Sequence, residues 1–182
     1  MTYDSKIHKR RSIRLKEYDY SQEGLYFVTI CVNVGANGIR PHIFGEVING
    51  EMVLNDVGKI VHNEWLKTSD IRSNVQLDAF IVMPNHVHGI IVITHDDRGV
   101  CDSDNQGVCD TPLRSPSNTV GAIVRGYKSA VTKQLRQLGH TRIIWQRNYF
   151  EHIIRNTKDC NNIFEYITNN PVNWKQDKFY MT

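Results

Sequence analysis

The sequence lacks any apolar run that approaches the roughly 20 residues needed to cross a bilayer. Its first six residues are not followed by the apolar stretch of a secretory signal. Four cysteines are scattered over 182 residues, a number and spacing that give little support to a disulfide framework. No serine-centred motif and no phosphate-binding glycine loop is present. We therefore expect a soluble, cytoplasmic protein with reduced thiols.

Net charge is also small, at +3, and does not by itself indicate a nucleic-acid partner. The positive charge is nevertheless uneven, because six of the 22 lysines and arginines fall between Lys6 and Lys16. From Asp96 to Asn118 the composition changes to Asp, Ser, Asn, Gly and Pro, and Gly-Val-Cys-Asp occurs twice. With 40% hydrophobic residues, the chain predicts a single domain over 1–182 with a basic N-terminal arm (1–20) and a flexible insert (96–118).

Hydrophobic periodicity predicts alternating strands and helices. Tight-turn chemistry at Asn49-Gly50 predicts a small hairpin, and Pro84-Asn85 predicts a turn between two central strands. Asp56 is the expected cap of the first helix, and Asn156 or Thr157 that of the last. The expected strands are 26–32, 75–83 and 86–93, and the expected helices are 56–66, 120–138 and 157–169. This order predicts an α+β fold, a ferredoxin-like (RRM-like) antiparallel sheet with helices packed on one face.

Two histidines carry the first chemical signal. Side chains alternate across a strand, so His86 and His88 project from the same face and present two imidazoles to one metal ion. Their position just after the Pro84-Asn85 turn predicts a sheet end that solvent and substrate can reach. Two ligands leave open positions for phosphate oxygens, which favours Mg²⁺ or Mn²⁺ over a closed structural zinc site.

Two separated segments carry a resemblance to a known family. Met83-Pro84-Asn85-His86-Val87-His88-Gly89-Ile90-Ile91 resembles the His-hydrophobic-His motif of the single-tyrosine transposases of small bacterial insertion sequences. The segment from Trp145 to Asn156 resembles the tyrosine region of one branch, the REP-associated tyrosine transposases. The arm from Arg10 to Leu15 and the closing segment from Tyr166 to Pro171 also fit that branch.

The resemblance implies a metal-dependent endonuclease that cleaves single-stranded DNA near hairpins through a 5′-phosphotyrosine intermediate and can rejoin strands. It implies Tyr149 as the nucleophile and His86 and His88 as the metal ligands. The relatives act as monomers or homodimers, so either state is open here. Phosphate contacts are expected from the basic arm and from charges near the tyrosine, namely Arg10, Arg11, Arg14, Arg147 and Arg155.

Several alternatives stay open at this point. The third metal ligand is Glu151 if residues 149–155 form a strand and His152 if they form a helical turn. A domesticated hairpin-binding protein without turnover is one rival function. A metal-dependent phosphoesterase that activates water in place of tyrosine is another.

Overall fold

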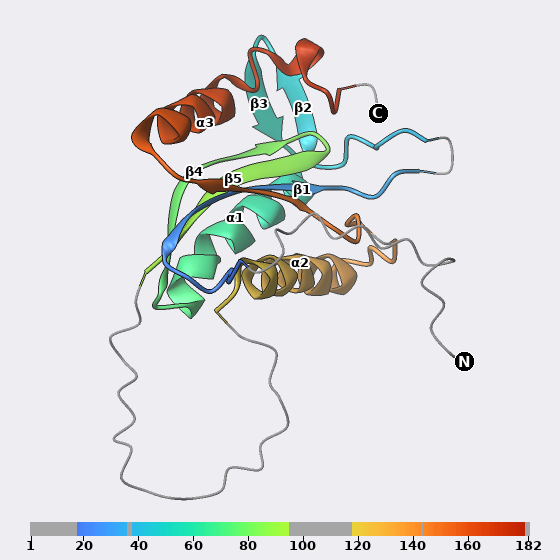
Figure 1. Cartoon of the computed structure of the whole chain (residues 1–182). Helices are drawn as coiled ribbons and strands as arrows, with labels where there is room; N and C mark the ends of the chain where they lie inside the picture. Colours follow the sequence, from blue (N-terminus) through green and yellow to red (C-terminus); the bar gives the residue numbers. More distant parts are fainter. Residues whose placement is uncertain (1–17, 36–37, 95–117, 143, 181–182) are drawn as a thin grey trace, which may run out of the picture.

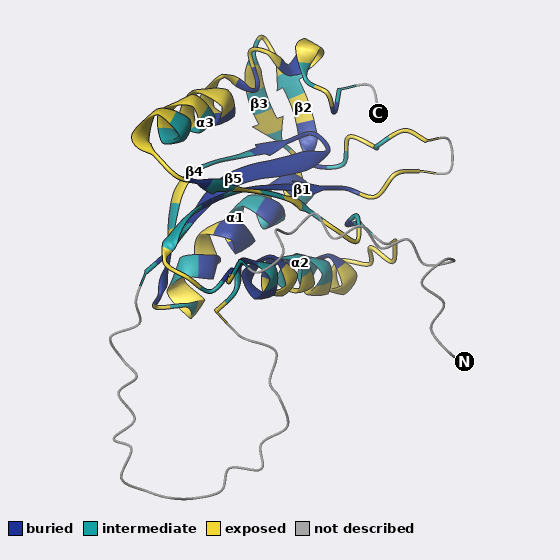
Figure 2. Ribbon diagram, viewed as in Figure 1, coloured by how far each residue is buried: buried dark blue, intermediate teal, exposed yellow. Residues whose placement is uncertain are grey.

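A four-stranded antiparallel sheet lies at the centre of the computed structural model, which describes residues 18–35, 38–94, 118–142 and 144–180 (Figure 1). The strand order is β4-β5-β1-β6, so β4 and β6 form the edges. The strands are β1 (Gly24–Cys31), β4 (Val75–Met83), β5 (His86–Ile93) and β6 (Phe150–Ile154). The central strand β5 is buried along nearly its whole length (Figure 2).

Three α-helices cover the two faces of this sheet. Helices α1 (Asp56–Ile71) and α2 (Val120–Gln137) pack on one face, and α3 (Thr157–Asn169) lies across the other (Figure 1). The main-sheet order β1, α1, β4, β5, α2, β6 confirms the predicted ferredoxin-like α+β class. Helix α3 matches the predicted helix 157–169, but it lies on the face opposite α1 and α2, so the helices do not all share one face. The remaining elements are a hairpin of β2 (Gly45–Ile48) and β3 (Glu51–Leu54) and a 3₁₀ turn, η1 (Trp174–Gln176).

Strand alternation divides the sheet into two chemically different faces. The α1/α2 face carries aliphatic and aromatic side chains such as Tyr26, Val28 and Ile30, which form the largest core cluster. The α3 face carries Phe27 and, one pair further along, Thr29. This second face includes the predicted metal ligands, because Thr29 pairs with His88 in the register between β1 and β5.

Turns and caps follow the expected chemistry with one shift. The hairpin turn has positive φ at both Asn49 (53°) and Gly50 (81°), as the predicted Asn-Gly turn requires. Helix α1 is capped by Asn55 and not by Asp56, because the Asn55 side chain accepts the Gly58 N–H at 2.9 Å. Helix α3 is capped by Asn156, one of the two residues expected.

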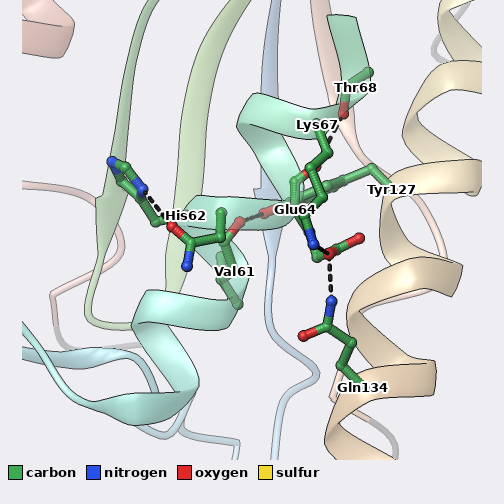
Figure 3. Close-up of polar contacts among 8 residues, drawn as sticks. Val61, His62, Glu64, Lys67, Thr68, Tyr127 and Gln134 are labelled. Carbon is green, nitrogen blue, oxygen red and sulfur yellow. Dashed lines mark hydrogen bonds and ion pairs between the residues drawn. The ribbon is translucent and has the colours of Figure 1, made fainter. Parts of the chain in front are cut away.

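A partly buried polar contact joins α1 to α2 beside the larger core. The carboxylate of Glu64 accepts hydrogen bonds from Lys67 and from Gln134 of α2 (Figure 3). The Tyr127 hydroxyl donates to the Val61 carbonyl at 3.0 Å. These hydrogen bonds give partners to polar atoms that would destabilise the fold if they were buried without one.

The close approach of β5 to α1 predicts a large effect of a small substitution. A Cβ built on Gly89 would lie within 3.0 Å of three atoms of the Trp65 ring, which is fully buried. Gly89→Ala is therefore expected to destabilise the fold by roughly 1–3 kcal/mol through overpacking. For a chain of this size, each kcal/mol lowers Tm by roughly 2–4 °C, which differential scanning calorimetry would measure.

Gly126→Ala is the matched control for that substitution. Gly126 lies within α2, and the nearest atom to its added Cβ is the Arg72 guanidinium at 3.3 Å. A helical glycine costs about 1 kcal/mol relative to alanine, so this variant is expected to melt at or above the wild-type Tm. An unchanged Tm for Gly89→Ala would contradict the tight strand-to-helix packing.

Part of the predicted organisation lies outside the described residues. Of the basic arm (1–20) only residues 18–20 are described, so Arg10, Arg11 and Arg14 lie outside the described residues, and of the 96–118 insert only Asn118 is described. Within the described ranges, no helix combines the length and apolar character needed to span a bilayer.

Candidate functional site

His86 and His88 lie side by side on the α3 face of β5, as alternation predicts. Their ring centroids are 4.3 Å apart. Both side chains are buried, however, and this differs from the expected solvent-open sheet end. The reason is tertiary, because the segment after α3 returns over the strand and sets the Phe179 ring 4.7 Å from the His86 ring.

The hydrogen bonds of His86 select the tautomer that a metal ligand needs. Its Nδ1 lies 2.9 Å from the Asn85 Oδ1, and a carbonyl oxygen only accepts, so Nδ1 carries the proton. Asn85 is itself held by donating from Nδ2 to the Phe179 carbonyl at 2.8 Å. The Nε2 of His86 is buried and hydrogen-bonds to no group in the described part of the chain. An unprotonated, buried imidazole nitrogen without a partner fits a cation.

His88 shares this arrangement but has a tyrosine at its second nitrogen. Its Nδ1 lies 2.8 Å from the Thr29 hydroxyl on the neighbouring strand. Its Nε2 lies 3.2 Å from the hydroxyl of Tyr166 on α3. Because Thr29 can accept the Nδ1 proton, Nε2 is available either to the tyrosine or to a metal ion.

Both imidazoles are neutral at physiological pH. Burial, followed by the charges of Lys178 and Arg40, lowers the pKa of His86 to about 3. Burial and the neighbouring His86 lower the pKa of His88 well below its ordinary value, although the carboxylate of Asp177 acts in the opposite direction. A neutral imidazole is the form that coordinates a metal.

Asp177 completes the set of possible ligands. Single ligand atoms of His86, His88 and Asp177 all lie within 4.8 Å of one another. The carboxylate is oriented by the Phe179 N–H on Oδ1 (2.7 Å) and by the Asn170 side chain on Oδ2 (2.9 Å). Two imidazoles and one carboxylate leave coordination positions open, as a catalytic divalent cation requires.

Tyr166 lies against this cluster and, like Asp177, is a candidate site residue that the sequence prediction did not assign. Its hydroxyl donates to the Asp177 Oδ2 at 3.1 Å and lies 3.2 Å from His88. Ile163, Tyr166, Ile167 and Asn170 recur at helical spacing, and this face of α3 turns towards the sheet. Burial and the charge of Asp177 raise the pKa of Tyr166, so its phenol is protonated at neutral pH.

Substrate-sized space adjoins the tyrosine. A pocket of about 320 Å³ is lined by Tyr166, Asp177 and amide side chains that include Asn169 and Asn173. Tyr166 is 40% exposed, although the histidines beneath it are buried. The cluster is therefore reached from the side of α3 and the 3₁₀ turn.

Tyr149 does not lie with the histidines. Residues 150–154 form a strand, so Tyr149 and Glu151 share one face, and the Tyr149 hydroxyl donates to Glu151 at 2.6 Å. That face is the α1/α2 face, since Glu151 pairs with Val28 and Tyr149 packs against the larger core. The sheet separates both residues from His86 and His88.

Neither expected third ligand joins the histidine pair. Glu151 lies on the opposite face, as described above. His152 lies on the α3 face, where its Nε2 is 2.8 Å from the Asp159 carboxylate, and its side chain is 54% exposed. In the described residues Asp177, and not Glu151 or His152, is the carboxylate or imidazole that lies with the histidine pair.

The predicted phosphate contacts fall in several places. Arg147 and Arg155 are exposed, and they lie shortly before and directly after β6 in the chain. A basic pocket of about 670 Å³ on α2 includes Lys128, Lys133 and Arg136, but it lies on the helix that covers the other face of the sheet. Burial lowers the pKa of Lys128 to about 8, and its ammonium donates to the carbonyls of Gln146 and Asn148.

Comparison with known proteins adds relatives of two kinds. No protein-family model matches the sequence. A protein of Haemophilus influenzae described as uncharacterized is 43% identical over 180 residues, which is 98% of this chain and 97% of that protein. A second protein of Haemophilus influenzae, which its name assigns to the REP-associated tyrosine transposases, is 28% identical over 100 residues, or 52% of this chain and 48% of that protein.

A solved structure also shares the fold. It is a REP-associated tyrosine transposase bound to a REP hairpin, with a TM-score of 0.58 and 20% sequence identity. The likeness covers 91% of this chain and 77% of that chain.

Proposed function

We propose that the chain is a REP-associated tyrosine transposase, as its likeness to two such proteins supports, and that it cleaves single-stranded DNA beside a hairpin with Tyr166 as the nucleophile. One observation carries the proposal: the Tyr166 hydroxyl lies within hydrogen-bonding distance of both His88 and Asp177. The related transposase that holds a REP hairpin supports hairpin DNA as the substrate class.

The reaction follows from the groups around the phenol. Tyr166 Oη attacks the scissile phosphorus, the phosphorus–O3′ bond breaks, and the 3′ oxygen leaves and takes up a proton as a free hydroxyl. The phenol must lose its own proton, and the Asp177 Oδ2 already accepts its hydrogen bond. The product is a 5′-phosphotyrosine, which conserves the phosphodiester energy and allows rejoining by the reverse attack.

His86, His88 and Asp177 are the residues that would hold a divalent cation. Mg²⁺ or Mn²⁺ bound there would polarise the phosphate and stabilise the charge that develops on it. The chain's own part is to keep both imidazoles neutral and correctly oriented, through Asn85 for His86 and Thr29 for His88.

The resemblance predicts Tyr149 as the nucleophile, whereas the geometry favours Tyr166. The hydroxyl of Tyr149 is engaged by Glu151 on the face opposite the metal ligands. Two tyrosines on different faces of one sheet cannot both reach a phosphate held at His88. The proposal therefore depends on which of them becomes linked to DNA.

Mapping a covalent adduct tests the proposal directly. The full chain is incubated with Mn²⁺ and labelled hairpin DNA from the sequence flanking its own gene, and the adduct is digested and sequenced by mass spectrometry. The expected result is DNA linked to the peptide that contains Tyr166. DNA on the Tyr149 peptide would overturn the assignment of the nucleophile.

The same reaction separates the two rival functions. Metal-dependent cleavage without any adduct would indicate a phosphoesterase that uses water. Hairpin binding without cleavage or adduct would indicate a domesticated DNA-binding protein. Either result would contradict the proposed tyrosine chemistry.

A further inference from the structure

An exposed aromatic residue continues the site towards the edge of the sheet. Phe150 pairs with Thr29, and Thr29 pairs with His88, so the three residues form a row across β6, β1 and β5 on one face. Neighbouring strands are about 4.8 Å apart, which puts the backbone of Phe150 roughly 10 Å from that of His88. Nucleotides adjacent to a phosphate at His88 can reach this position.

The Phe150 side chain is a large apolar ring that lies exposed at the surface. It is 46% exposed, and its strand β6 is an edge of the sheet, with no further strand beside it among the described residues. Its nearest aromatic neighbour is Phe179, with ring centroids 6.3 Å apart. By contrast, Phe27 on the next strand is covered by His88 and Tyr166.

Two positively charged side chains surround this aromatic surface. The Lys178 ammonium lies 5.6 Å from the centre of the Phe150 ring and 4.8 Å from that of Phe179. The Arg40 guanidinium lies 5.4 Å from the centre of the Phe179 ring. An accessible ring beside cations is the combination by which proteins hold single-stranded nucleic acid, since bases stack on the ring and phosphates meet the charges.

We propose that Phe150 is a stacking platform for one unpaired base next to the cleaved phosphate, and that Lys178 contacts the adjoining backbone. The proposal rests on the proposed function, because it takes single-stranded DNA as the occupant. Continuity with the row through Thr29 to His88 favours DNA over a protein partner, and so do the flanking cations. Stacking is tolerant of sequence, so this contact would supply affinity and position more than base identity.

Binding without cleavage tests the platform. Anisotropy of a fluorescein-labelled hairpin with a single-stranded flank is measured in EDTA for wild type, Phe150→Ala, Phe150→Trp and Phe164→Ala. Phe164 is the matched control, since it is similarly exposed, at 48%, but lies on α3 and not on the edge strand β6. Phe150→Ala is expected to weaken binding about 5- to 100-fold, whereas Phe150→Trp retains it. Phe164→Ala should stay within roughly twofold of wild type.

An abasic scan of the flank makes the test specific to stacking. For wild type, removing the base at one position of the flank is expected to weaken binding of the DNA. For Phe150→Ala, removing the base at the same position should cause no further loss of affinity. Equal affinities for wild type and Phe150→Ala would overturn the platform alone, whereas a wild type that does not bind the hairpin would overturn the proposed function. Loss of a dimer in Phe150→Ala, detected by sedimentation velocity, would overturn the platform by assigning this surface to a second copy.

Discussion

Replacing Tyr166 with phenylalanine is expected to abolish the covalent DNA adduct and to lower the single-turnover rate of strand cleavage by about 10³-fold or more. The substitution removes only the oxygen that lies beside His88 and Asp177. The ring remains and keeps its contacts with His88 (centroids 5.0 Å apart) and Phe27 (6.1 Å). Tyr149→Phe is the matched variant and is expected to cleave at a rate near that of wild type.

Two controls distinguish a loss of chemistry in Tyr166→Phe from a loss of the fold or of DNA binding. The Tm of Tyr166→Phe should stay close to the wild-type value, and hairpin binding in EDTA should persist. Full cleavage by Tyr166→Phe together with loss in Tyr149→Phe would make Tyr149 the nucleophile. In that case the contacts of Tyr166 would be structural, and the site would need a rearrangement that brings the other face of β6 to the DNA.

Replacing His86 with alanine is expected to weaken Mn²⁺ binding by at least about 100-fold, since it removes a ligand and not merely a residue that orients one. Isothermal titration calorimetry without DNA would measure the loss apart from cleavage. Asp177→Asn tests the third ligand with little change of shape, and it too should weaken binding. Asn85→Ala should have an intermediate effect, roughly 10–100-fold, because Asn85 fixes the His86 tautomer but is not itself one of the possible ligands.

His140→Ala is the control for the metal measurement, because His140 is exposed beyond the end of α2. It is expected to bind Mn²⁺ as wild type does. Circular dichroism of each variant checks that the fold is retained. Wild-type affinity in both His86→Ala and Asp177→Asn would show that the cation binds elsewhere.

Local patterns were sufficient to predict most of the elements. Alternation identified three of the six strands by range, and Asn49-Gly50 identified the hairpin of β2 and β3, which has the expected positive φ values. The sixth strand, β6, was left open between strand and helical turn because five residues carry too little periodicity. The helix cap was displaced by one residue, since Asn55 and Asp56 are both good caps and only backbone geometry distinguishes them.

The site was predictable only where it is local. The shared face of His86 and His88 follows from their spacing on one strand, and so does that of Tyr149 and Glu151. Which face each pair occupies depends on how β6 registers against β1, a long-range pairing that spacing does not encode. Asp177 lies in the segment after α3, which has no regular repeat and returns over β5. No sequence pattern predicts a possible ligand in such a segment.

The two faces of the sheet also bear on how such a chain evolves. The residues that hold the cluster come from α3, the 3₁₀ turn and one side of β5, whereas the largest core lies on the opposite side under α1 and α2. Mutations that silence the chemistry therefore need not disturb that core. Under the proposed function, a descendant selected only for holding a DNA hairpin can therefore lose the Tyr166 hydroxyl and keep its fold, because the ring contacts with His88 and Phe27 remain.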